Sequence, residues 1–572
     1  MDMKTRIAAL AAECMKSLWP DAEGLPAAEE LRGLLAVPPD PAMGDYAFPC
    51  FRLAKPLRTA PPKIAEALCA AWNHAEVASV QPVNGYMNFF LNRENFAAET
   101  MAALLSQGER YGSSELGKGK TVCLDYSSIN IAKRFHIGHL STTMIGHSLK
   151  RIFDFLGYTT VGINHLGDWG TQFGKMVCAY KKWGSREDVE ARGIDAMTEL
   201  YVRFHEEAEK DPSLEDEGRA WFKKIEDNDP EAMEIFSWFK EVTLRDAAKV
   251  YEKLGVTFDS YAGESFYNDK MEPVIHELRD KGLLVQSEGA WVVDLEGDSM
   301  PPCLILKSDG ATIYATRDLA AAIYRQNTYH FDKCLYVVAY QQDLHFRQVF
   351  RVLEKMGYAW AKNCVHVAFG MVSFEGEALS TRKGNVVLLE DLLDQAVAKA
   401  REIIEEKSPN LENKDEVARQ VGIGAVVYTD LSANRIKDID FRWERALNFD
   451  GESAPYVQYT HARCCSVLRK AGDLAAAAPD WSALTDDEAQ ALLRLLSRFP
   501  DVIREAADKY EPSMVTRAVT DIAQAFNKYY YEHRILDGEP AQASARVALT
   551  QATCAVIKTG LCLIGIEAPE RM

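Results

Sequence analysis

The chain has 572 residues, more than one hydrophobic core supports, and the usual domain size predicts about three to four domains. Its 47% apolar and 26% charged residues are typical of a folded protein, and no apolar stretch is long enough to cross a membrane. The formal net charge of −19 argues against a protein that coats nucleic acid non-specifically, although it allows a shaped RNA partner bound by local basic patches.

The N-terminal part of the chain predicts a small α+β domain. It begins with an amphipathic helix whose internal charges make it a poor secretory signal, so we expect a cytoplasmic protein. A Pro-rich link near residues 38–41, an apolar helix at 62–75 and a strand at 86–91 follow. A linker with Gly and Ser at residues 107–120 ends this part, and we expect a first domain over residues 1–115.

Strand-like and helix-like segments alternate from residue 121 onwards. Strands are expected at residues 121–126 and 158–164, with helices at about 136–156 and from Thr171. This order implies right-handed βαβ connections and a parallel sheet, so the predicted fold class is α/β with a Rossmann-like domain at residues 116–400.

Charged, helically periodic sequence at residues 184–269 predicts an insertion into the sheet domain, which we extend to about 184–300. Short strands follow at 291–295 and 302–307, and the alternation then resumes. It comprises strands within 333–340 and 363–370 and a helix at 344–356. From residue 386 the periodicity is helical to the end, which predicts an all-α bundle over residues 401–572.

Residues 136–139, HIGH, follow the strand expected at 121–126 and lie at the start of the next predicted helix. A helix start offers free N–H groups and partial positive charge to phosphates, and Gly138 leaves room for a nucleotide beside the backbone. Two His residues at this spacing are more often a surface pair or half of a metal site. A second motif, ALSTRKGN at residues 378–385, follows the last sheet strand. It is either an ordinary solvated turn or a loop that closes on the same triphosphate, since ligands of parallel sheets collect beyond the carboxyl ends of strands.

The two motifs together resemble those of class I aminoacyl-tRNA synthetases, and longer segments resemble the arginyl-tRNA synthetase family. This resemblance implies a Rossmann-like catalytic domain, an N-terminal α+β domain that binds tRNA and a C-terminal helical anticodon-binding domain. The segments that carry it are DYSSINIAK at 125–133, GINHLGDWGTQFGK at 162–175, YATRDLAAA at 314–322, QQDLHF at 341–346 and GIEAPERM at 565–572.

The implied reaction is arginine activation by ATP followed by transfer of arginine to the 3′ end of tRNA(Arg). A guanidinium has five donors and needs a carboxylate with flanking acceptors, and we assign this carboxylate to Asp318. Tyr314, four residues earlier, is expected to form a wall of the pocket, and Gln342 to add polar contacts. Taken alone, a Tyr–Asp pair at this spacing is more often a surface or capping arrangement. By the resemblance, the α-amino and carboxylate ends of arginine are held by Asp125, Ser128 and Asn130.

Activation transfers the adenylyl group of ATP to arginine. In this reaction the protein mainly positions groups and stabilises developing charge. The residues expected to bind ATP are His136, Gly138, His139, Ser380 and Lys383. The second motif departs from the class pattern KMSKS, because Ala378 and Thr381 replace its two Lys. By the resemblance Lys133 compensates, and Arg382 and Lys383 remain as cations in the loop. We expect Mg²⁺ to accompany ATP as a substrate complex. No tightly bound cofactor is expected, nor a structural zinc, because the twelve Cys include no CxxC pair.

The segments at 453–472 and 526–536 resemble the anticodon-binding domain, with expected RNA contacts at Tyr459, Phe526, Tyr530 and Met572. Aromatic residues at helical spacing are more often core, and only exposed rings can stack on bases. By analogy we expect a monomer without a membrane partner.

Three rival functions fit the sequence less well. A cysteinyl enzyme of the same class would need a zinc-ligand set, and a small nucleotidylyltransferase would not need the C-terminal bundle. A non-catalytic tRNA-binding paralogue is disfavoured by the intact His136, Gly138, His139 and Asp318.

Overall fold

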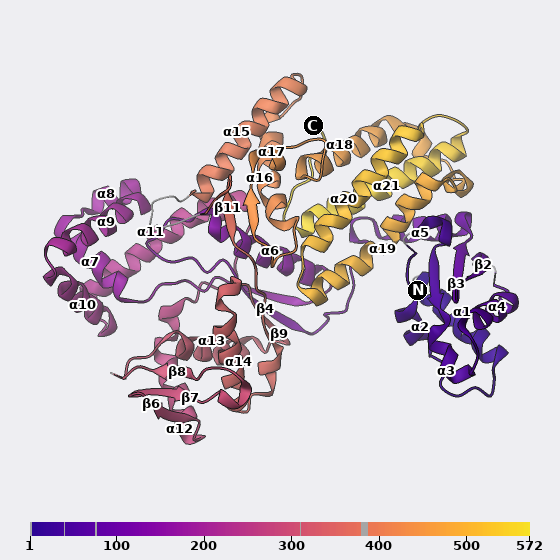
Figure 1. The fold of residues 1–572 in the computed structure, drawn as a ribbon. Coiled ribbons are helices and arrows are strands. Elements are labelled where there is room, and N and C mark those ends of the chain that lie inside the picture. Colours follow the sequence, from indigo (N-terminus) through magenta and orange to yellow (C-terminus); the bar gives the residue numbers. More distant parts are fainter. Residues whose placement is uncertain (1–2, 39, 75–76, 309, 379–386) are drawn as a thin grey trace. The chain divides into compact units, whose positions relative to one another are not determined.

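The computed structural model describes residues 3–38, 40–74, 77–308, 310–378 and 387–572 (Figure 1). The chain forms two compact units, each assembled from several segments. Unit 1 comprises Met1–Gly108, Val467–Ser497 and Lys528–Ala552, and unit 2 comprises Glu109–Ser466, Arg498–Asn527 and Thr553–Met572. The domain boundaries expected at residues 115 and 400 stay predictions.

Unit 1 contains a three-stranded antiparallel sheet in the order β1-β3-β2. The Asn84-Gly85 turn joins β2 and β3, and both residues have positive φ, 49° and 83°, the backbone that a tight two-residue hairpin requires. The strand predicted at 86–91 and the helices predicted at the N-terminus and near residue 62 are confirmed. The elements are α1 (Met3–Leu18), α2 (Ala28–Leu34), β1 (Tyr46–Pro49), α4 (Pro61–Ala71), β2 (Val77–Val83), β3 (Tyr86–Leu91) and α5 (Arg93–Gln107).

Unit 2 is built on a four-stranded parallel sheet in the order β10-β9-β4-β5. The central strand β4 is buried along most of its length, because helices α6 and α13 pack against it, and this explains its nearly continuous apolar pattern TVCLD. This confirms the predicted α/β class. The elements are β4 (Thr121–Asp125), α6 (Leu140–Phe155), β5 (Thr159–Ile163), α7 (Thr171–Trp183), α13 (Tyr314–Tyr329), β9 (Lys333–Tyr336), α14 (Asp343–Lys355) and β10 (Cys364–His366).

Between β5 and β9 the chain forms the predicted helical insertion and then a separate antiparallel sheet, β6-β7-β8. The short strands expected near 291 and 302 exist, and they pair with each other rather than with the parallel sheet. The elements are α8 (Arg186–Arg192), α9 (Ile194–Lys210), α10 (Ser213–Glu226), α11 (Pro230–Leu254), α12 (Met271–Asp280), β6 (Leu284–Ser287), β7 (Ala290–Val293) and β8 (Cys303–Leu306).

The C-terminal region is helical, as predicted, with one exception. Residues 439–441 form strand β13, which pairs in parallel with β11, so the expectation of unbroken helix after residue 386 was wrong there. A three-residue strand has no periodicity of its own and forms only because its partner lies beside it. The elements are β11 (Val372–Phe374), β12 (Glu377–Ala378), α15 (Leu389–Lys407), α16 (Lys414–Leu431), β13 (Ile439–Phe441), α18 (Ala454–Ala471), α19 (Asp487–Lys509), α20 (Ser513–Glu532) and α21 (Pro540–Leu563).

Within the described ranges, none of the helices combines the length and the apolar character needed to cross a lipid bilayer.

Candidate active site

The HIGH segment lies in the connection from β4 to α6. His136 is the N-cap of a short 3₁₀ turn at Ile137–His139, which leads directly into α6. The rings of His136 and His139 are 4.1 Å apart between centroids. The two predicted histidines therefore form one imidazole pair at a helix start, the position where backbone N–H groups favour an anion.

Both histidines of the pair are held in the neutral form. Burial, with a smaller effect of His136, lowers the pKa of His139 to about 3. Burial, and to a smaller extent the positive charge of Lys133, lowers the pKa of His136. The Nδ1 atom of His136 accepts the N–H of Gly138 at 3.1 Å, and an N–H can only donate. The proton of the neutral His136 ring therefore sits on Nε2, which is left as a donor.

Gly138 is required by the close packing of this turn. A Cβ atom built there would lie 2.8 Å from Cε1 of His136, and this ring is fixed by its hydrogen bond to the Gly138 backbone. Any side chain at this position would displace the imidazole.

The chain that follows the second motif returns to the HIGH segment. The N–H of Ile137 donates to the carbonyl of Val387 at 2.9 Å, and Leu389 N–H donates to the carbonyl of Phe135 at 3.0 Å. The HIGH segment is thus joined by backbone hydrogen bonds to residues 387–389, which follow the second motif in the chain. The predicted Ser380, Arg382 and Lys383 lie outside the described residues.

Asp125, the last residue of β4, is buried and has partners on both oxygens. Its Oδ2 lies 2.8 Å from Nη2 of Arg325, and its Oδ1 accepts the hydroxyl of Ser128 at 2.8 Å. Ser127 and Ser128 have positive φ angles of 70° and 47°, so the chain turns sharply at the carboxyl edge of the sheet. Arg325 was missed because no motif marks a single Arg within a helix.

Asn130 lies beside the NHLGDWG segment. Ile131 N–H donates to Gly167 O at 3.1 Å, and Gly167 N–H donates to Ile129 O at 2.9 Å. A Cβ atom at residue 167 would come within 2.3 Å of the Asn130 side-chain oxygen, so glycine is needed for the two segments to approach. This gives Gly167 a physical role that the sequence left open.

Asp318 is on α13, one turn after Tyr314, as predicted. Its Oδ2 lies 2.6 Å from Nε2 of His345, and both side chains are about three-quarters buried, with 23% and 25% exposure. Tyr314 is 67% exposed, and Gln342, in the 3₁₀ turn Tyr340–Gln342 that precedes α14, is exposed as well. The carboxylate of Asp318 is therefore largely buried, whereas Tyr314 and Gln342 are open to solvent.

Several acidic groups surround Asp318. Burial raises the pKa of Glu264 to about 7; Arg317 opposes this shift, and the charges of Asp318 and Asp168 add to it. Burial also lowers the pKa of His165, a shift that the charges of Asp125 and Asp318 oppose and that of Arg325 reinforces. Acidic side chains thus lie near Asp318, and two of them, Asp125 and Asp168, are paired with Arg325 and Lys240. His165 and His345 lie within segments quoted for the resemblance, but spacing alone gave them no role, and Glu264 lies in none of those segments.

Asp168, in the same region, is held by three hydrogen bonds to its carboxylate. It is completely buried and accepts from Lys240 Nζ at 2.7 Å, from the Ser265 N–H at 2.8 Å and from the Ser265 hydroxyl at 2.7 Å. These bonds fasten the NHLGDWG segment to α11 and to the chain before α12.

The residues predicted to contact RNA differ in exposure. Tyr459 and Tyr530 are 43% and 41% exposed, whereas Phe526 is fully buried. Phe526 therefore cannot stack on a base, and the core-packing alternative holds for it. Met572 packs against a cluster of buried residues of α15 and α16. Tyr531, which the sequence analysis did not select, is 86% exposed.

Three family models match consecutive parts of the chain. The model described as tRNA synthetases class I (R), catalytic domain, matches residues 100–443. The DALR anticodon binding domain matches residues 457–572, and the arginyl tRNA synthetase N terminal domain matches residues 3–91.

Individual proteins are similar over nearly the whole chain. The arginine–tRNA ligase of Alkaliphilus metalliredigens is 54% identical over 95% of this chain and 96% of its own length. That of Clostridioides difficile is 53% identical over the same shares. Among solved structures, the Thermus thermophilus arginyl-tRNA synthetase is 26% identical and superposes with a TM-score of 0.83 over 100% of both chains.

Proposed function

Because the chain belongs to the class I arginyl-tRNA synthetases and is an arginine–tRNA ligase, we propose that arginine and ATP bind beyond the carboxyl ends of β4 and β9. The arginine carboxylate attacks the α-phosphorus of ATP, pyrophosphate leaves, and arginine then passes from the adenylate to the 3′ end of tRNA(Arg). The chain is thus a catalyst and not a non-catalytic RNA-binding paralogue.

The guanidinium of arginine is bound by Asp318 in this proposal. His345 fixes the orientation of the carboxylate through its 2.6 Å hydrogen bond, and Glu264 adds a second acid to the same region. Tyr314 and Gln342 complete the outer side of the pocket, and Ser128 and Asn130 face the other end of the substrate. The role predicted for Asp125 is limited by Arg325, which already neutralises its charge. The largely buried Asp318–His345 pair, with Glu264 nearby, is the observation that carries this proposal.

The ATP phosphates are bound by hydrogen bonds from His136 and His139 and by charge from Lys133. The neutral imidazoles contribute donors and no net charge, so the cations Lys133, Arg382 and Lys383 are needed to balance the triphosphate, with Ser380 as a further donor. Gly138 admits the nucleotide beside the backbone. Mg²⁺ enters with ATP as part of the substrate.

The RNA partner is tRNA(Arg), with Tyr459, Tyr530 and Met572 as contact residues of the helical region. The working form in this proposal is a cytoplasmic monomer whose arginine activation requires bound tRNA.

The test is the variant Asp318→Ala, with Asp318→Asn as the isosteric form. Loss of one partner of a desolvated ion pair costs roughly 3–5 kcal/mol, so kcat/KM for arginine in aminoacylation should fall about 10²–10³-fold or more. Asp188→Asn, which removes an exposed carboxylate paired with Arg192, is the matched control and should leave the rate unchanged. A near-normal kcat/KM for arginine in Asp318→Ala would remove Asp318 from the pocket.

A further inference from the structure

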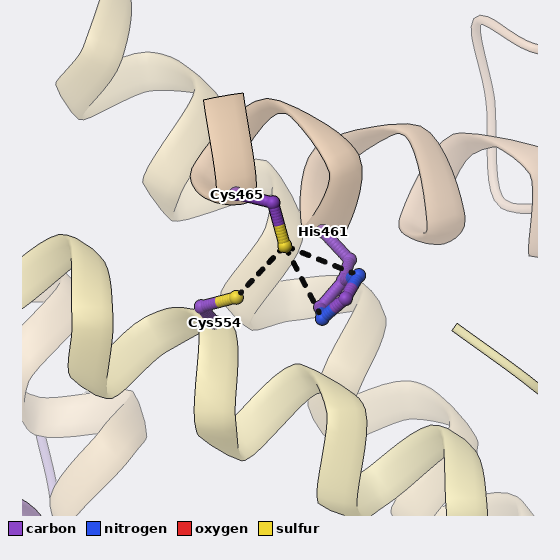
Figure 2. Close-up of side chains that lie close together, drawn as sticks. All are labelled: His461, Cys465 and Cys554. Carbon is purple, nitrogen blue, oxygen red and sulfur yellow. Dashed lines mark hydrogen bonds between the residues drawn. The ribbon is translucent and has the colours of Figure 1, made fainter. Parts of the chain in front are cut away.

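Three side chains that can bind a metal ion meet in the C-terminal helices of unit 2, and the proposed reaction uses none of them (Figure 2). His461 and Cys465 lie one turn apart on α18, and Cys554 comes from α21. The two sulfur atoms are 3.5 Å apart, and Cys465 Sγ lies 3.8 Å from Nε2 and 3.9 Å from Nδ1 of His461. All three candidate ligand atoms lie within 4.8 Å of one another.

His461 presents a free nitrogen to this cluster. Its Nδ1 is 2.9 Å from the carbonyl oxygen of Pro569, which can only accept, so Nδ1 carries the proton. The neutral ring therefore keeps an unprotonated Nε2, and the side chain is only 2% exposed. A histidine oriented through Nδ1–H by a backbone carbonyl, with Nε2 free, is the arrangement commonly found around metal ions.

We propose that Nε2 of His461 and the thiolates of Cys465 and Cys554 bind one Zn²⁺ ion. Zn–S bonds of about 2.3 Å and Zn–N bonds of about 2.0–2.1 Å in a tetrahedron place two sulfurs about 3.8 Å apart and nitrogen and sulfur about 3.6 Å apart. The observed 3.5 and 3.8 Å are close to these values. The fourth position is filled by water, because Cys465 is only partly buried.

The charges and protons of the site balance. Each thiol loses one proton to solvent as its Zn–S bond forms, so two protons leave and two thiolate charges cancel the charge of Zn²⁺. A disulfide between the same sulfurs would require a two-electron oxidant and a shortening from 3.5 Å to about 2.05 Å, and it would leave His461 without a role.

The ion would link α18 to α21 and to the C-terminal segment. His461 binds Pro569, and Gln458, on the same helix, donates to the carbonyl of Glu567 at 2.7 Å. The site therefore has a structural role, distinct from the ATP and arginine site. It revises the expectation of no structural zinc, which rested on the absence of CxxC spacing.

The test uses the full-length protein, reduced with a phosphine and stripped of metal by a chelator. Titration with Zn²⁺ against a chromophoric competitor should show one tight site, and Co²⁺ should give thiolate-to-cobalt charge-transfer absorption. Cys465→Ser and Cys554→Ser should each weaken Zn²⁺ binding by about 100-fold or more and reduce this absorption. Cys562→Ser, which removes an exposed thiol on the same helix α21, is the matched control and should bind like the unchanged protein.

A measurement on the unchanged protein guards against variants that fail to fold. Zn²⁺ should protect Cys465 and Cys554 from alkylation, mapped by mass spectrometry, and leave Cys562 reactive. Absence of charge-transfer absorption, equal binding by the two Ser variants and the control, or peroxide-driven formation of a Cys465–Cys554 disulfide that Zn²⁺ does not slow would each overturn the proposal.

Discussion

At the scale of single residues, different side chains at the HIGH turn supply the hydrogen bonds and the positive charge. His136 and His139 are neutral because burial disfavours the imidazolium form, so in the proposed ATP site they would offer hydrogen bonds and no net charge. Lys133 is exposed and close enough to lower the pKa values of both rings. It is therefore the described cation best placed to supply charge at the HIGH turn.

We expect Lys133→Ala to lower ATP–arginine activation about 10²–10³-fold, the usual loss when one preorganised donor is removed. The measurement is ATP–pyrophosphate exchange with tRNA present. Arg134→Ala is the control, because the neighbouring Arg134 is engaged with Asp195 at 2.5 Å. A decrease of less than about threefold in Lys133→Ala would assign the charge to Lys383 instead.

A second residue-scale prediction concerns pH and Asp430 of α16. Asp430 is buried and accepts the hydroxyl of Ser141, two residues after the HIGH segment, at 2.5 Å. Burial raises the pKa of Asp430 to about 7, whereas an unfolded Asp titrates near 3.9. The folded state therefore binds this proton more tightly than the unfolded state does. The stabilisation of the folded state by this proton is lost as the pH rises from about 4 to about 7.

Asp430→Asn cannot ionise and should not show this loss. The free energy of unfolding of the variant, relative to the unchanged protein, should increase between about pH 5 and pH 8 by a few kcal/mol, since one pKa unit corresponds to about 1.4 kcal/mol. Urea unfolding at the two pH values measures the difference. Asp415→Asn, which changes a 94% exposed side chain, should show no such trend, and parallel behaviour of the two variants would contradict the assignment.

At the scale of secondary-structure elements, α13 is fastened to the sheet by a buried ion pair. Arg325 of α13 is 1% exposed and Asp125 of β4 is 8% exposed, and they meet at 2.8 Å. The same helix carries Tyr314 and Asp318 at its first turns. The pair therefore sets the position of the proposed guanidinium pocket relative to the end of β4.

Arg325→Met should destabilise the protein by about 3–5 kcal/mol, because it leaves the Asp125 carboxylate buried without a counter-charge. The double variant Arg325→Met with Asp125→Asn should recover most of this loss. Arg192→Met breaks two exposed pairs, with Asp188 and Glu199, and each should cost less than about 1 kcal/mol. Urea unfolding of all three compares them, and a double variant no more stable than the single one would contradict the ion-pair explanation.

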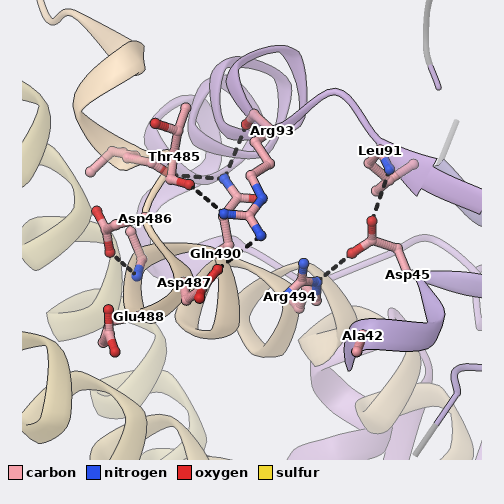
Figure 3. A network of polar contacts seen from close by, with 12 residues as sticks. Ala42, Asp45, Leu91, Arg93, Thr485, Asp486, Asp487, Glu488, Gln490 and Arg494 are labelled. Atoms are coloured by element: carbon pink, nitrogen blue, oxygen red, sulfur yellow. Dashed lines mark hydrogen bonds and ion pairs between the residues drawn. The ribbon is translucent and has the colours of Figure 1, made fainter. Parts of the chain in front are cut away.

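At the scale of the whole molecule, compact units combine segments that are far apart in sequence. In unit 1, Asp45 accepts from the Leu91 N–H at 2.8 Å and from Arg494 Nε at 2.6 Å (Figure 3). Arg93 donates to the carbonyl of Thr485 at 2.8 Å and pairs with Asp487 at 2.8 Å. The N-terminal sheet and part of α19 thus form one structural body within this unit.

RNA binding by a chain with a net charge of −19 must depend on local contacts, including exposed rings. We expect Tyr530→Ala to weaken tRNA binding by about 5–150-fold, because stacking of one base on an aromatic ring contributes about 1–3 kcal/mol. Filter binding measures the dissociation constant. Phe526→Leu, a change of a buried ring on the same helix, should lower stability and leave tRNA affinity unchanged. Equal effects of the two variants on tRNA affinity would exclude Tyr530 as a contact.

The sequence by itself determined the elements whose signals are local. The alternation of apolar strands with amphipathic helices predicted β4, β5 and α14, and the strand pattern at residues 86–91 predicted β3. The HIGH turn could also be identified, because its helix start and its two His residues are contiguous in the chain. Such features depend on neighbours within one or two turns, which a single sequence contains.

The tertiary structure alone decided which side chains meet across the chain. It brought His345 to Asp318, Arg325 to Asp125, and Cys554 to the His461–Cys465 pair, and it formed β13 by providing β11 as a partner. It also distinguished the buried Phe526 from the exposed Tyr530 on one helix. These outcomes depend on packing between segments separated by many residues, and neither spacing nor composition of one chain specifies such contacts.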